Sequence, residues 1–294
     1  MERVSGGQGM LRSVFWDVQH GSAACIRTPS NSYFAIDLGT GSHSYGSREF
    51  SPLVSLRDDW GVVHLDGVII THPHRDHLDD IFNLDALSPR VLLRPSHLTD
   101  DETRSGNREQ DYDVIDQYLK VCRGYTCDVS CEASPFAPSN NGGVAFQTFV
   151  PHRCPTSNLN NHSVVTVISY ASSKLLIPGD NEPLSWAELL EDRHFIAAID
   201  GTDILVAPHH GRDSGFSSDL FRYIHPKLTV ISDGPFCESS ATERYAAHTS
   251  GWQVHSRSGG TQERQCVTTR NDGVVVIEFG ALPDRRPYIE ATID

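Results

Sequence analysis

The sequence lacks long apolar runs. Nowhere do about 18 apolar residues follow one another, so no membrane-spanning helix is expected. Residues 1–7 also lack the apolar stretch of a secretion signal, which favours a cytoplasmic location. With 38% hydrophobic and 21% charged residues among 294, the composition excludes a largely disordered chain and predicts one domain, residues 1–294, with a sizeable core.

Basic residues are scarce as well. The 38 acidic and 24 basic side chains give a formal net charge of −14. Nucleic acids are held mainly through lysine and arginine contacts to phosphates, and the sequence has no basic run beyond the pair Arg285 and Arg286. The charge therefore disfavours a nucleic-acid substrate without excluding it, and a small phosphodiester is easier to accommodate. The oligomeric state is left open.

The seven cysteines follow no regular spacing. Their odd number, in a chain without a secretion signal, favours reduced thiols. Cys122, Cys127 and Cys131 cluster, with Cys154 further on, but the C-x-x-C spacing of a structural zinc site is missing. Scattered thiols are the better interpretation.

One short segment does concentrate metal-binding side chains. The segment His72-Pro-His74-Arg-Asp76-His77 directly follows the β-branched residues 68–70, which are typical of a buried strand. Residues two apart on an extended chain share a face, so His72 and His74 can hold one ion. Asp76 and His77, which begin the next helical turn, can then hold a second. Imidazole nitrogen suits zinc, and a carboxylate beside it suits zinc, manganese or iron.

This motif resembles the signature of the metallo-β-lactamase fold. Three further segments resemble that family in the expected order: residues 34–39, which contain Asp37; residues 175–180, which end in Asp180; and residues 204–211, which contain His209 and His210. The resemblance covers about residues 12–279. It implies an α/β fold, a four-layer αββα metallo-β-lactamase sandwich, followed by an acidic, proline-containing tail at 280–294.

The detailed spelling is similar to the soluble metallo-β-lactamase-like domain of ComEC, the DNA-uptake channel of competent bacteria. The matching segments are residues 17–22, 160–163, 178–180 and 209–211. His20 departs from this pattern, because the family usually has glycine there. Because no run of about 18 apolar residues occurs, the membrane channel of that protein is not expected here, and the chain is interpreted as a free-standing relative of the domain.

The resemblance also implies a dinuclear metal site with two divalent ions, zinc being favoured. Asp37 would orient the metal-binding histidines from behind. The implied ligands of the first ion are His72, His74 and His162. Those of the second ion are Asp76, His77 and His209, and Asp180 would bridge both ions.

Two assignments stay open at this stage. His162 directly precedes an apolar strand pattern, whereas His152 ends another, so either or neither could complete the first site. Of the adjacent pair, His209 is favoured as the ligand. His210 is then expected to protonate the leaving oxygen or to point into the core, and Asp76 to orient the attacking water.

The implied function is that of a metal-dependent hydrolase, with a phosphodiesterase or nuclease favoured. In such a site two ions about 3.5–4 Å apart share a hydroxide and stabilise the phosphoryl oxygens during in-line attack. The alternative is hydrolysis of a carboxyl ester, lactone, thioester or β-lactam at the same site, because a fold alone does not fix function. The third hypothesis is a non-catalytic binding or scaffold module.

Apolar periodicity and turn residues predict the remaining elements. Residues 99–111 are expected to form a mobile insertion, and residues 134–143 a linker between two similar halves. The pattern at 265–279, with Asn-Asp-Gly at 271–273, predicts a β-hairpin. The other expected strands are 13–16, 23–26, 33–36, 145–150, 164–170, 175–177, 204–207 and 228–232, and the expected helices are 78–87, 111–122, 184–192, 216–224 and 242–249.

Overall fold

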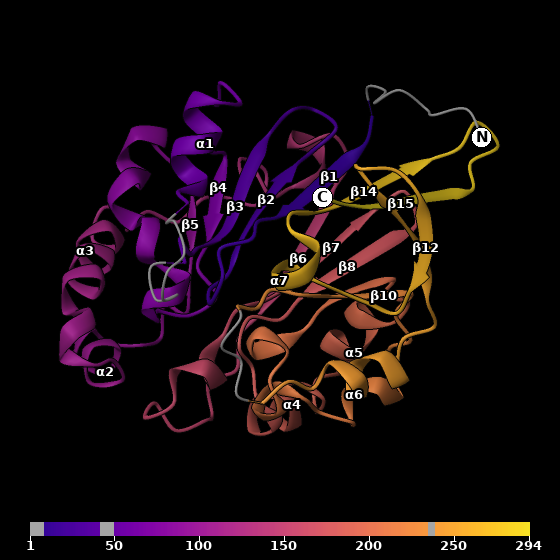
Figure 1. Ribbon diagram of the computed structural model, residues 1–294. Coiled ribbons are helices and arrows are strands. Elements are labelled where there is room, and N and C mark those ends of the chain that lie inside the picture. Colours follow the sequence, from indigo (N-terminus) through magenta and orange to yellow (C-terminus); the bar gives the residue numbers. More distant parts are fainter. Residues whose placement is uncertain (1–8, 42–49, 235–238) are drawn as a thin grey trace.

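The protein is a sandwich of two facing β-sheets with helices on both outer faces (Figure 1). The computed structural model describes residues 9–41, 50–234 and 239–294. Helices α1 to α3 cover one sheet, and α4 to α6 cover the other (Figure 1). The α/β fold with four αββα layers, which the resemblance to the metallo-β-lactamase sandwich predicted, is therefore confirmed.

The larger sheet has the order β12-β11-β15-β14-β1-β2-β3-β4-β5 in the described part of the chain. Most neighbouring strands are antiparallel, but β3, β4 and β5 run parallel to one another, and so do β11 and β15. Its strands are β1 Leu11–Phe15, β2 Ala23–Arg27, β3 Tyr33–Leu38, β4 Gly67–Ile69, β5 Leu92–Leu93, β11 Trp252–Ser256, β12 Thr261–Arg264, β14 Val275–Ala281 and β15 Pro287–Ile293.

The smaller sheet has the order β13-β10-β9-β8-β7-β6. Its strands are β6 Ala145–Phe149, β7 Val165–Tyr170, β8 Ser173–Ile177, β9 Ile204–Val206, β10 Leu228–Ile231 and β13 Cys266–Thr268. The helices are α1 Pro52–Asp58, α2 Asp100–Ser105, α3 Tyr112–Cys122, α4 Pro183–Leu189, α5 Arg193–Ile199, α6 Thr242–Ala247 and α7 Thr269–Asp272.

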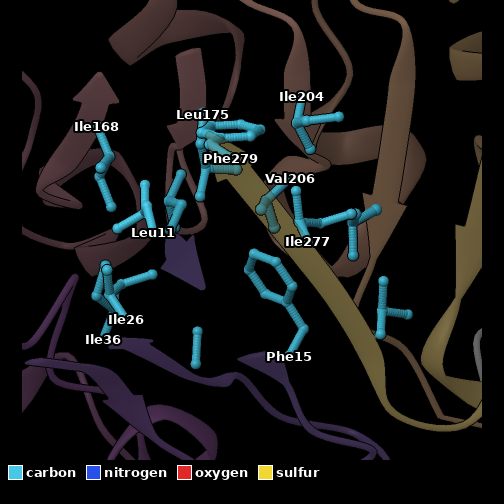
Figure 2. Packing of buried hydrophobic residues seen from close by; sticks show 14 of the residues in the cluster. Leu11, Phe15, Ile26, Ile36, Ile168, Leu175, Ile204, Val206, Ile277 and Phe279 are labelled. Atoms are coloured by element: carbon cyan, nitrogen blue, oxygen red, sulfur yellow. The ribbon is translucent and has the colours of Figure 1, made fainter. Parts of the chain in front are cut away.

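The core between the sheets is built from the inward faces of both. Figure 2 shows Phe15 and Phe279 of the larger sheet against Leu175 and Val206 of the smaller one. The strands that carry the site, β4 and β9, are buried along their whole length, which explains their continuous apolar spelling. Their loops are thereby anchored to a rigid double sheet.

The hairpin predicted at 265–279 is wrong. Strand β13 belongs to the smaller sheet and β14 to the larger one, so the segment crosses between the layers. The turn residues form the one-turn helix α7 instead: Thr268 caps it by accepting from the Asn271 N–H, and Asp272 accepts from the Thr268 N–H. Partners elsewhere, β10 and β1, outcompete the local pairing that the turn signal favours.

The predicted tail at 280–294 is also wrong. Strand β14 continues to Ala281, and β15 pairs antiparallel with β14 and parallel with β11. The side chains of Ile289 and Ala291 are buried in the core between the sheets. This terminal segment is part of the larger sheet.

Several helix predictions need correction. Residues 99–111, for which the sequence predicts a mobile insertion, contain helix α2, which starts with a reciprocal capping box between Thr99 and Glu102. The single helix expected at 184–192 ends at Leu189 and is followed by α5, which Asp192 caps. The region 216–224 holds only a 3₁₀ turn at Leu220–Arg222, and 78–87 is a 3₁₀ helix at Asp79–Leu87. Helices α3 and α6 agree with the predictions at 111–122 and 242–249.

Candidate metal centre

The predicted site residues lie where strands of the two sheets end side by side. Strands β3 and β4 of the larger sheet deliver Asp37 and the histidine motif, and β8 and β9 of the smaller sheet deliver Asp180 and the His209-His210 pair. A backbone hydrogen bond of 3.2 Å from His209 N–H to Gly179 O joins the loops after β9 and β8. Another, of 2.8 Å, joins Val164 N–H, directly before β7, to Thr71 O after β4.

Two groups of three side chains bring nitrogen and carboxylate atoms within 4.8 Å of one another. One group is His72, His77 and Asp180, and the other is His20, Asp76 and His210. The groups adjoin, because His77 Nε2 lies 3.3 Å from His210 Nε2. Asp180 spans both, with Oδ1 3.4 Å from His77 Nε2 and Oδ2 3.5 Å from His210 Nε2.

His74 joins the same cluster. Its Nδ1 atom lies 3.0 Å from His72 Nε2, and His72 Nε2 lies 3.9 Å from Asp180 Oδ2. The structure thus brings the proposed ligands His72, His74, Asp76, His77 and Asp180 into one cluster. The cluster also contains His210, which the sequence did not favour as a ligand, and His20, which it did not assign to the site.

Hydrogen bonds to the Nδ1 atoms, on the side of the rings away from the cluster, set the tautomers of His77 and His210. Asp37 Oδ2 lies 2.8 Å from His77 Nδ1 and also accepts from Thr71, while Ser232 O lies 3.0 Å from His210 Nδ1. Both Nδ1 atoms therefore donate, which leaves lone pairs on both Nε2 atoms. The two Nε2 atoms are 3.3 Å apart and lie next to the carboxylates of Asp76 and Asp180. Their lone pairs repel one another and the carboxylates unless a proton or a cation lies between them. The donor set fits a divalent metal ion.

The pKa values express the same demand for positive charge. Burial alone lowers the pKa of His210, but Asp180 and Asp76 outweigh it and raise the pKa to about 10. Burial likewise raises the pKa of Asp76, but the His210 hydrogen bond and the charge of His77 hold it well below its usual value. The cluster is built to hold cationic charge.

His162 has a buried ring nitrogen that is available to a metal ion, and His152 does not. His162 is fully buried, its Nδ1 lies 2.9 Å from His97 Nε2, and its Nε2 has no hydrogen-bond partner among the described residues. Buried polar atoms without a partner are uncommon in folded proteins, and a bound metal ion would supply one here. His152 is exposed and lies with Glu188 at a separate surface hollow.

The adjacent histidines face different neighbours. His210, rather than His209, contacts Asp76, at 3.3 Å. His209 Nε2 lies 3.8 Å from Asp180, whereas its Nδ1 lies 2.9 Å from Ser214 Oγ and 3.3 Å from Glu182 Oε1. His209 lines the open side of the cluster.

The backbone after β9 is strained in a way that explains this division. His209, His210 and Gly211 have φ values of +50°, +54° and +69°, a left-handed run that residues with a Cβ adopt rarely. A hydrogen bond from Ala241 N–H to Gly211 O holds the turn. The two imidazoles therefore project to different sides of the loop.

Glycine at position 39 explains the Asp-x-Gly spelling. A Cβ there would lie 2.6 Å from Asp76 O and 2.9 Å from Ser22 N. The Ser22 N–H donates to the same Asp76 oxygen. Gly39 thus lets the metal-motif loop settle directly on β2 and β3.

A polar pocket of about 550 Å³ opens over the cluster. Its lining includes His74, Asp76, Asp180 and His209 together with three residues that sequence reasoning did not assign to the site: His20, Arg108 and Arg212. Glu182, the partner of His209, was also missed, although its place two residues after Asp180 was a usable signal. The arginines carry no signal of their own in the sequence.

Comparisons with known proteins give similar folds only. No family model and no curated protein matches the chain. Similar solved structures include a diphosphatase of the PhnP family, with 13% identity, 92% of this chain and 98% of that chain covered, and a TM-score of 0.45. A Cronobacter sakazakii metallo-β-lactamase with a mutated motif has 18% identity, coverages of 65% and 74%, and a TM-score of 0.34. The β-hydroxylase CmlA, as an E377D mutant, has 12% identity, coverages of 76% and 46%, and a TM-score of 0.45. At these TM-scores the likenesses carry no argument, and the site rests on its own geometry.

Two further expectations concern the rest of the chain. Cys122, Cys127, Cys131 and Cys154 are free thiols, and within the described ranges no cysteine joins a candidate metal group. Among the described residues, no helix is both long and apolar enough to cross a membrane.

Proposed function

We propose that the chain is a metal-dependent hydrolase of the metallo-β-lactamase type and that it cleaves phosphodiesters. The carrying observation is the convergence of His77 Nε2, His210 Nε2 and the two carboxylates Asp76 and Asp180, with both histidine tautomers fixed from behind. A purely structural cluster would not direct that many electron pairs at one place beneath a pocket.

Each ion would have three ligands of its own and share Asp180. His72, His74 and the orphaned Nε2 of His162 would hold the first ion, and Asp76, His77 and His210 the second. We thus propose His210, instead of His209, as the ligand. The bound ions, zinc for preference and manganese or iron as alternatives, would supply Lewis-acid stabilisation of phosphoryl charge and a nucleophile at neutral pH.

The proton for the leaving oxygen would come from His209. Both nitrogens of His210 are engaged, whereas His209 lies at the pocket and is oriented through Nδ1 by Glu182 and Ser214. The pKa of Glu182 is lowered, chiefly by its hydrogen bond with His209, so a carboxylate lies next to the proposed proton donor. This arrangement exchanges the roles that the sequence assigned to the two histidines.

The pocket lining favours phosphoryl over neutral acyl substrates. Arg75, Arg108 and Arg212 border the pocket, and arginine is the side chain best matched to phosphate oxygens. Acidic partners neutralise Arg75 and Arg108, and the whole chain carries −14, so a long nucleic acid is a poorer substrate than a small phosphodiester. The spelling similar to ComEC-type domains supports phosphodiester chemistry but not this size limit.

Hydrolysis of bis(p-nitrophenyl) phosphate by protein reconstituted with zinc or manganese tests the proposal. Metal-dependent turnover is expected, with a loss of at least ~10³-fold in His74→Ala, because that variant removes a proposed ligand. Thioester, lactone and β-lactam substrates run on the same preparation are expected to react more slowly. Faster turnover of any of these, or activity that survives both a chelator and His74→Ala, would sink the phosphodiesterase assignment.

A further inference from the structure

One arginine of the pocket is set apart from the other two by its partners. Arg75 lies 2.9 Å from Asp79 Oδ1, and Arg108 lies 3.1 Å from Asp111 Oδ2. Arg212 is half-buried, and no carboxylate of the described residues pairs with its guanidinium. A cation next to a low-dielectric site without a counter-ion favours the binding of an anion.

The ring of His20 holds this guanidinium in place. Arg212 Nη2 lies 3.3 Å from His20 Nδ1 and 3.2 Å from His20 Nε2, and His20 Nε2 lies 3.5 Å from Asp76 Oδ2. The guanidinium is thus separated from the candidate metal ligands by one imidazole ring. The guanidinium is not itself placed among the candidate metal ligands, but it borders the same pocket.

The size and lining of the pocket limit what the anion can belong to. A volume of about 550 Å³ is that of a small-molecule site, not of a nucleic-acid groove. Asn160, which also lines the pocket, donates through Nδ2 to Glu182, the neighbour of His209. The pocket therefore presents a cation among polar side chains, which suits a small, charged ligand.

From this geometry we infer that Arg212 binds a second anionic group of the substrate, so that the site prefers small phosphodiesters that carry an additional phosphate. This inference rests on the proposed phosphodiesterase function and names its substrate class. The planar guanidinium can donate two parallel hydrogen bonds to phosphate oxygens, which a single ammonium group cannot do. The scissile group would lie over the metal ligands, and the second phosphate beyond His20.

Calorimetric binding of two nucleotides that differ by one phosphate tests the inference without requiring turnover. Thymidine 3′,5′-bisphosphate is expected to bind the metal-reconstituted protein at least about tenfold more tightly than thymidine 5′-monophosphate. Arg212→Met is expected to bring the two affinities within about threefold of each other. Arg212→Lys, which keeps the charge without the fork, is expected to retain part of the preference.

Arg222→Met is the matched control. Arg222 is an exposed arginine that pairs with Asp219 outside the pocket, so this variant should keep the full preference. Melting temperatures of all variants identify any that fail to fold, and Arg212→Lys carries the test if Arg212→Met does not fold.

Equal affinity of the wild type for both nucleotides, or an unchanged preference in both Arg212 variants, overturns the inference. The same pair as 5′-p-nitrophenyl esters separates it from the proposed function. A binding preference without hydrolysis of either ester contradicts the phosphodiesterase assignment alone. Hydrolysis of both esters without any binding preference contradicts the role of Arg212 alone.

Discussion

Replacing His210 by alanine is expected to lower phosphodiester turnover at least ~10³-fold and to release about one of the two proposed metal ions per chain, because it removes a proposed ligand. Replacing His209 should leave the metal content unchanged. His209 and His210 are adjacent in the sequence and lie at the same cluster, so His209→Ala is the matched control for His210→Ala. Metal analysis and the rate with bis(p-nitrophenyl) phosphate measure both effects.

The leaving group distinguishes the roles further. A p-nitrophenolate departs without a proton, so His209→Ala should have a small effect on that substrate and an effect of about 10²-fold or more on an alkyl phosphodiester. Loss of metal in His209→Ala with retention in His210→Ala would reverse the assignment and restore the one that the sequence favoured.

Removing the carboxylate of Asp37 is expected to weaken both the metal site and the fold. Asp37 accepts from Thr71 N–H, from Thr71 Oγ1 and from His77 Nδ1, and it is almost completely buried. Asp37→Ala strands these donors, so the free energy of unfolding should fall by about 2–4 kcal/mol. Chemical denaturation measures this change.

Asp37→Asn isolates the effect on the metal. Asparagine tolerates the left-handed backbone at this position, where φ is +59°, and keeps one acceptor oxygen, but it lacks the charge that orients His77. Metal affinity is expected to fall about 10–100-fold. Asp66→Asn is the control, because Asp66 accepts from the Tyr33 N–H at the start of β3 and touches no candidate ligand. An equal loss of affinity in both variants would contradict the orienting role of Asp37.

The parts of the fold that could be predicted from the sequence are those where pattern and environment agree. The buried strand before His72 is read from its continuous β-branched run, and the histidine spacing follows from the extended chain after it. The hairpin prediction at 265–279 is wrong because the Asn-Asp-Gly turn signal is local, whereas β13 and β14 pair with strands of different sheets. The strand at 287–293 was not predicted, because it pairs with β11 and β14 and this pairing is not visible in the local sequence pattern.

The candidate site also has a part that the sequence predicts and a part that it does not. Spacing places His72, His74, Asp76 and His77 together, but it cannot choose between two adjacent histidines, because the choice depends on the left-handed backbone after β9. Nor can spacing find Arg212, whose proposed role depends on His20, 192 positions away, and on the lack of a carboxylate partner among the residues that the structure describes. Such features exist only once the sheets face each other.

The number of metal ions bound per chain tests the central claim most directly. Elemental analysis after reconstitution with zinc or manganese and removal of free metal should give about two ions for the wild type and one or fewer for Asp180→Ala, because Asp180 lies between both groups. A wild-type chain that retains no divalent ion, or an Asp180→Ala variant that retains two, would contradict the dinuclear centre.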